Sequence, residues 1–136
     1  MKAAKESVTF SSVEVSEFTG VTLRQLQWWD EQGITYVGRT GSGYRREYTV
    51  DSVVTVHVVK ALRDRGVSLK RIRQLAKSVQ QRWDSLYLVV GKRNCHFPQD
   101  YLTLVTILLR CKEPVVVVSP ADYARRMKRL IEKEAA

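Results

Sequence analysis

The sequence predicts an α+β protein in two parts: four helices with a hairpin in residues 1–82, then a small β-β-α-β-α unit in residues 83–136. Three observations support this prediction. A short segment, residues 22–33, carries the start and stop signals of a helix; a glycine-rich basic stretch follows it; and beyond Trp83 short β-forming runs alternate with helical patterns. With 136 residues, 44% of them apolar, the chain is long enough to bury a core.

The helix expected at residues 22–33 has both ends marked in the sequence. Thr22 and Gln25 have the spacing of a capping box, in which a hydroxyl and an amide satisfy backbone N–H groups reciprocally. Gly33 supplies the left-handed residue that ends a helix.

The two faces of this helix differ in chemistry. Leu23, Leu26 and one of the two adjacent tryptophans are expected to share the inner face. Arg24, Gln25 and Gln27 are expected to point outward. Because arginine and glutamine form bidentate hydrogen bonds with guanine and adenine edges, the pattern predicts a helix that enters the major groove of DNA.

A shorter helix precedes it. Ser11 or Ser12 can cap a helix that runs to about Phe18, with Glu14 in the first turn, where the helix dipole favours an anion. Residues 19–21 contain a glycine and form a tight turn between the two helices. This is the helix-turn-helix pattern.

A basic hairpin is expected directly after Gly33. Residues 34–37 alternate like a strand, and three glycines in six residues follow, flanked by β-forming residues. The hairpin carries Arg39, Arg45 and Arg46, with Tyr44 and Tyr48 interleaved. We interpret it as a wing beside the recognition helix, in preference to a solvated loop whose arginines only aid solubility.

Two further helices complete the first part. One begins after Thr49 and runs to about Arg65, with Asp51 in its first turn; Ser68 caps the other. The apolar stripe of the second comprises Leu69, Ile72, Leu75, Ala76 and Val79, and its opposite face carries Lys70, Arg71, Arg73 and Lys77. An ordinary solvated face and a phosphate-contacting face both fit this basic pattern.

The second part is expected to contain strands at residues 86–90, 95–97 and 115–118, a helix from Asp100 to about Leu109, and a final helix capped by Ser119. About fifty residues make a marginal core, so this unit should pack on the first part or on a second copy. Its aromatic residues, Trp83, Tyr87 and Tyr101, are expected in the core rather than around a ligand.

Charge and composition narrow the class of function. The 23 Lys and Arg against 14 Asp and Glu give a net charge of +9, and residues 1–83 carry 14 of the basic and 8 of the acidic residues. This excess favours a polyanionic partner. There is no signal peptide pattern and no apolar run long enough to cross a membrane, so we expect a cytoplasmic protein without a membrane partner.

No cofactor, metal or catalytic site is expected. Cys95, His96 and Cys111 lack metal-ligand spacing, so we interpret the two cysteines as structural. His57 and His96 show no Ser/His/Asp or paired-carboxylate arrangement, and we therefore expect no enzyme activity.

Residues 18–33, the Gly/Arg/Tyr hairpin and residues 62–72 together resemble the winged-helix DNA-binding domain of the MerR family, over about residues 10–80. The resemblance implies a dimeric bacterial transcription regulator that binds double-stranded DNA. Its second helix would enter the major groove, its wing would contact the backbone, and RNA polymerase would be a further partner. By position, the DNA-binding residues would be Thr22, Arg24, Gln25, Gln27, Trp28, Arg39, Tyr44, Arg45 and Arg46.

Three departures from the family pattern stand out. Gln27 occupies a position where the family usually has an arginine, and the wing is one residue longer before its closing tyrosine, which leaves the roles of Arg45 and Arg46 open. The long antiparallel coiled-coil helix that builds the family dimer is absent. We therefore predict that residues 84–136 make the dimer contact, through a strand edge, the last helix, or both.

Two alternatives remain. An excisionase-like architectural factor would also use a small basic winged helix, but at a recombination site rather than a promoter. A ligand- or protein-binding module would act through residues 83–136, as a sensor, without specific DNA affinity for the whole chain.

Overall fold

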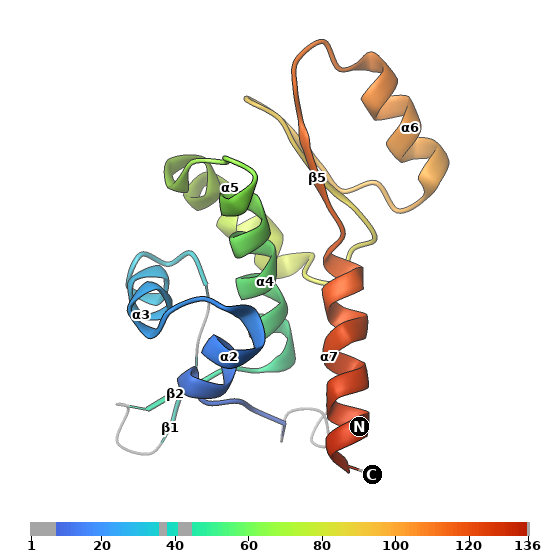
Figure 1. Cartoon of the computed structure of the whole chain (residues 1–136). Coiled ribbons are helices and arrows are strands. Elements are labelled where there is room, and N and C mark those ends of the chain that lie inside the picture. The colour runs from blue at the N-terminus through green and yellow to red at the C-terminus, as the bar shows by residue number, and fades with distance from the viewer. Residues whose placement is uncertain (1–7, 36–37, 41–44, 136) are drawn as a thin grey trace.

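The order of elements follows the sequence prediction. A computed structural model describes residues 8–35, 38–40 and 45–135 (Figure 1). Its helices are α2 (Ser12–Thr19), α3 (Leu23–Glu31), α4 (Val50–Asp64), α5 (Leu69–Gln81), α6 (Tyr101–Arg110) and α7 (Pro120–Ala135). Its strands are β1 (Gly38–Thr40), β2 (Arg45–Glu47), β3 (Leu88–Val90), β4 (Cys95–His96) and β5 (Val116–Val118). The predicted α+β class is confirmed.

Local capping chemistry sets where most of the helices begin. The side chains of Ser11, Thr22, Ser68 and Asp100 each accept a hydrogen bond from the backbone amide three residues on, at 2.7–3.2 Å. Thr49 also stands at a helix start, but its hydroxyl donates to the carboxylate of Asp51 and caps no backbone amide. Gly33 ends α3 with a φ of 73°, as predicted.

Two antiparallel sheets are present in the described residues. The hairpin pairs β1 with β2, Gly38 lying opposite Glu47 and Thr40 opposite Arg45, and residues 41–44 at its tip lie outside the described residues. The second sheet has the strand order β4-β3-β5, with Val90 of β3 opposite Val116 of β5. Both neighbours of β3 run antiparallel to it, so the β3–β4 turn and the start of β5 lie at the same edge.

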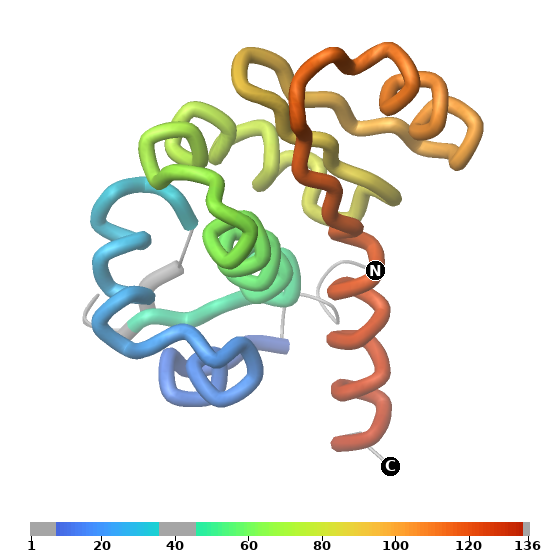
Figure 2. Tube along the Cα trace, turned by 45° about the horizontal axis from the view of Figure 1, so that its top comes forward, coloured from blue at the N-terminus to red at the C-terminus, as the bar shows by residue number. Residues whose placement is uncertain are grey.

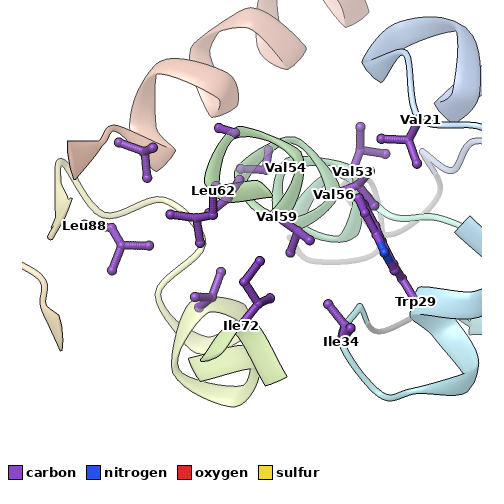
Figure 3. Close-up of a cluster of buried hydrophobic side chains, with 14 of the residues drawn as sticks. Val21, Trp29, Ile34, Val53, Val54, Val56, Val59, Leu62, Ile72 and Leu88 are labelled. Atoms are coloured by element: carbon purple, nitrogen blue, oxygen red, sulfur yellow. The ribbon is translucent and has the colours of Figure 1, made fainter. Parts of the chain in front are cut away.

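The core is built around α4, which has buried side chains on all sides. Val53, Val56 and Leu62 are all fully buried there, and Figure 3 shows Trp29, Ile72 and Leu88 from three other elements converging on this helix. A helix that is apolar around its whole circumference is stable only when other elements surround it. The many valines of α4, poor helix formers by themselves, are therefore stabilised by tertiary packing.

The last helix lies along α4 and joins the two predicted parts (Figures 1 and 2). Met127 of α7 is 2% exposed, and the ring of Tyr123 stacks on His57 of α4 with centroids 5.0 Å apart and planes 7° from parallel. Leu88 and Val118 belong to the same buried cluster as the helices of the first part. One hydrophobic core thus extends across the boundary that the sequence suggested near residue 82.

The burial of His57 predicts a dependence of stability on pH. Desolvation, then the positive charges of Arg126 and Lys60, lower the pKa of His57 from 6.5 to about 4. Between these values the unfolded chain binds a proton that the folded chain does not, so stability is complete above pH 6.5 and falls as the pH falls toward 4. We expect a loss on the order of 1–3 kcal/mol from this group.

The measurement is the free energy of urea unfolding at pH 7 and pH 4.5, for the native chain and His57→Gln. Protonation of carboxylates also destabilises the protein in acid, but it does so equally in both proteins. The difference between their pH dependences of the free energy of unfolding therefore reports on His57 alone. Equal pH slopes for the two proteins would contradict the assignment.

Some local expectations are wrong. Leu23, expected on the inner face of its helix, is 50% exposed, because the core contact of α3 is centred on Leu26 and Trp29. Tyr101, expected in the core, is 70% exposed at the start of α6. Residues 34–35 form a bend rather than a strand, although both side chains are buried; residues 36–37 lie outside the described residues.

Within the described residues, no helix combines the length and apolarity needed to cross a membrane.

Candidate nucleic-acid interface

The helix predicted to read DNA, α3, is held from its inner side and from its end. Leu26 and Trp29 are 1% and 4% exposed and attach the helix to the core. Beyond its last turn, α5 provides two polar contacts: Arg73 Nη1 donates to Gln32 Oε1 at 3.0 Å, and Gln80 Nε2 donates to the carbonyl of Ile34 at 3.0 Å. The position of α3 is therefore fixed by side chains distant in sequence.

The outer face of α3 carries three of the predicted site residues together. Arg24, Gln27 and Trp28 are exposed, Trp28 to 42%. Gln27 Nε2 donates to the carboxylate of Glu31 one turn later, at 3.0 Å. Among the described residues, Arg24 has no ion-pair partner, which leaves its guanidinium available to an external acceptor.

The capping box of α3 uses two other predicted site residues. Thr22 Oγ1 accepts from the Gln25 amide at 3.1 Å, and Gln25 Oε1 accepts from the Thr22 amide at 3.1 Å and lies 3.3 Å from its hydroxyl. A bidentate pair with adenine needs that same Gln25 oxygen as an acceptor. While the cap is intact, Gln25 offers a base only the hydrogens of Nε2.

The hairpin is tied to α3 by an ion pair. Arg46 Nε lies 2.8 Å from Asp30 Oδ2, and the two side chains are 23% and 9% exposed. Arg39 lies opposite Arg46 in the strand register, whereas Tyr44 falls outside the described residues. The hairpin is thus linked to α3 through Arg46.

The basic face of α5 is largely engaged within the chain. Arg71 Nε donates to the carbonyl of Gly91 at 3.1 Å and Nη1 to Gln74 at 3.1 Å, and Arg73 reaches Gln32 as described above. Lys70 and Lys77 are exposed. Half of the predicted basic face therefore connects elements of the fold.

Sequence reasoning missed the residues that position the site. Arg73, Gln80 and Asp30 each have a partner that is 16 to 46 residues away. No local spacing could have identified these pairs, because local patterns carry no information on tertiary contacts.

In the part of the chain that the structure describes, no three His, Cys, Asp or Glu side chains are placed to hold a metal ion. Cys95 and Cys111 are both free thiols of intermediate exposure.

Comparison with known families matches the chain to the family described as "MerR HTH family regulatory protein", over residues 10–79. This range covers α2 to α5 almost completely, including the hairpin. It is slightly more than half of the chain.

Curated relatives match about half of this chain. The nodulation protein NolA of Bradyrhizobium elkanii is 39% identical over 61 residues, which are 45% of this chain and 28% of that protein. An uncharacterized HTH-type transcriptional regulator of Mycobacterium tuberculosis is 30% identical over 80 residues, 57% of this chain and 36% of that protein. The chain thus matches about a third of the length of these relatives.

A similar fold is found in the crystal structure of HiNmlR, described as a MerR family regulator lacking the sensor domain, bound to promoter DNA. The TM-score is 0.50 at 15% identity, and the match covers 94% of this chain and 79% of that one. At this identity the similarity concerns the fold alone.

Proposed function

Since the chain belongs to the MerR HTH family of regulatory proteins, we propose that it is a bacterial transcription regulator that binds double-stranded DNA. The observation that carries the proposal is the outer face of α3. Arg24, Gln27 and Trp28 are exposed together there, on a helix whose inner face and C-terminal end are both anchored. The excess of basic residues in the first part of the chain favours the same partner.

In the proposed complex, α3 enters the major groove by its N-terminal end and the hairpin lies on the flanking backbone. Arg24 reads a base, because its guanidinium can form the bidentate pair with guanine. Trp28 and the hairpin arginines contact phosphates, and Gln25 assists through Nε2 while its oxygen keeps the cap. Because one small module covers few bases, high specificity requires two copies on a two-fold site.

The direct test of base reading is Arg24→Ala. Duplexes selected from a random library define the preferred site, and affinities are then measured on that site and on unrelated DNA. We expect a loss of about 1–3 kcal/mol on the preferred site and little change on unrelated DNA, as for a base contact. Arg129→Ala, an exposed arginine of α7, is the matched control.

Equal losses on both kinds of DNA would show that Arg24 holds only phosphate. Failure of the selection to enrich any sequence would overturn the proposed function. The location of genomic sites, at promoters or at recombination sites, would distinguish a transcription regulator from an architectural factor.

The hairpin gives a second prediction, which separates its two adjacent arginines. Arg45→Ala is expected to weaken binding to all sequences and to flatten the slope of log K against log salt by about one unit, since one phosphate contact is lost. Arg46→Ala removes the ion pair with Asp30 and should loosen the hairpin, which protease sensitivity of the free protein reports.

An unchanged salt slope for Arg45→Ala would contradict a backbone contact by this residue. If Arg46→Ala flattened the salt slope by the same amount without increasing protease sensitivity, then Arg46 would be the residue that contacts the phosphate.

The proposal also assigns the dimer contact to residues 84–136. The apolar side of α7 packs on α4 of its own chain, which favours a dimer contact elsewhere in this part. The dimer contact therefore falls to the remaining surface of this part, with RNA polymerase as a further partner when the protein is bound at a promoter.

A further inference from the structure

The outer surface of α6 is the largest concentration of exposed apolar side chains in the described residues. Leu109, Leu102 and Tyr101 are 81%, 76% and 70% exposed, and Leu108 is 38% exposed. Leu104 is the buried residue of this helix. Leu86, 41% exposed, extends the surface, because its amide lies 3.4 Å from Oε1 of Gln99, just before α6. We call Leu86, Tyr101, Leu102, Leu108 and Leu109 the α6 surface.

These side chains form a stripe along the helix. Leu102 and Leu109 are seven residues apart, as are Tyr101 and Leu108, which is two helical turns. Thr106 lies between them on the same side as Leu102 and Leu109. Single exposed apolar residues are ordinary, but a contiguous set of this kind marks a site of interaction.

We propose that a second copy of this chain covers the α6 surface, with the two α6 helices packed antiparallel about a two-fold axis. The inference rests on the proposed dimer and names the element that makes it. In this arrangement Leu102 of one copy lies opposite Leu109 of the other, and the two Thr106 residues lie close to the axis.

The charges at the ends of α6 favour this orientation. Asp100 caps the N-terminal end, where hydrogen bonds from the Thr103 amide and hydroxyl lower the pKa of its carboxyl and keep it charged. Arg110 closes the C-terminal end and has no ion-pair partner among the described residues. An antiparallel pair brings Asp100 of each copy toward Arg110 of the other and places the ring of Tyr101 beside that guanidinium. A parallel pair would instead place like charges and like ends of the helix dipoles together.

The position of α6 in the molecule is compatible with DNA binding by both copies. Figure 1 shows α6 on the opposite side of the molecule from α3 and the hairpin, so pairing through α6 leaves the proposed DNA interface of each copy uncovered. Two short helices with flanking residues make an interface below the roughly 1,200–2,000 Å² of stable complexes. The dimer is accordingly of micromolar strength in solution and is reinforced when both copies hold one DNA molecule.

The first test measures the dimer dissociation constant of the full chain by analytical ultracentrifugation. Leu102→Glu and Leu109→Glu should each raise it at least tenfold, because each places charges in the apolar contact. Val13→Glu is the matched control, since Val13 is an apolar residue of α2 that is 55% exposed away from the α6 surface, and it should leave the constant unchanged. Circular dichroism confirms that each variant is folded.

The second test fixes the orientation by disulfide cross-linking, with Cys95 and Cys111 first replaced by alanine. Thr106→Cys should cross-link with its own copy, because the two residues meet near the axis. Leu102→Cys alone should not, but a mixture of Leu102→Cys and Leu109→Cys should give the mixed dimer. Cross-linking of Leu102→Cys alone in place of Thr106→Cys would overturn the antiparallel arrangement.

The outcomes separate this inference from the proposed function. A dimer unaffected by both glutamate variants would refute the α6 contact and leave the dimer itself standing. The dimer would be refuted if the full chain stayed monomeric at a concentration of about 100 μM and bound its selected DNA as one copy. Binding of the α6 surface by a different protein, in a chain that stays monomeric, would refute it equally.

Discussion

Replacing Trp29 with alanine is expected to lower the free energy of unfolding by about 3–5 kcal/mol, the usual cost of removing a large buried aromatic side chain. Trp29 is 4% exposed and joins α3 to the cluster around α4. A loss of this size is a large part of the total stability of a small domain. Urea unfolding followed by far-UV circular dichroism measures it.

Its neighbour in the sequence is the natural control. Trp28 is 42% exposed on the outer face of α3, so Trp28→Ala should change the stability by less than about 1 kcal/mol. The same variant should weaken DNA binding, if Trp28 contacts a phosphate. A greater loss of stability in Trp28→Ala than in Trp29→Ala would show that the two faces of α3 have been assigned the wrong way round.

A change in the last helix should destabilise α3. Met127→Ala is expected to cost about 2–5 kcal/mol, because the side chain is 2% exposed and belongs to the cluster that also contains Leu26 and Trp29. If the core unfolds as one unit, the slowly exchanging amides of α3 should lose protection against hydrogen exchange by the same free energy.

The neighbouring Lys128→Ala is the control, since Lys128 is exposed on the same helix. Unchanged protection in α3 for Met127→Ala, together with reduced protection in α7, would show that residues 1–82 and 83–136 are separate folding units. The division into two domains is thus a prediction that this measurement decides.

Helix starts were the part of the fold most open to prediction. Ser11, Thr22, Ser68 and Asp100 cap helices where the sequence placed them, because a cap involves only the residue itself and an amide three positions later. The strand-strand-helix-strand-helix order of the second part was equally readable from local patterns and turn residues.

Tertiary partners could not be predicted in this way. Arg46 looked like a free wing arginine, yet it pairs with Asp30; the stripe of α7 looked available for a second copy, yet it packs on α4. In both cases the sequence shows that a side chain needs a partner, but not which one. The same limit applies to α6: seven of its ten residues are apolar, yet only Leu104 is buried.

The shared core has a consequence for operator length. Because α7 packs along α4, the helices that hold α3 and the three-stranded sheet that flanks α6 in the chain share one hydrophobic core (Figures 1 and 2). In a pair joined through α6, the separation and rotational phase of the two recognition helices are then set by packed residues such as Met127 and Val58, which touch no nucleotide. Such a protein would discriminate between operators by the number of base pairs between half-sites, and substitutions in its interior could change that preferred number without altering a single base contact.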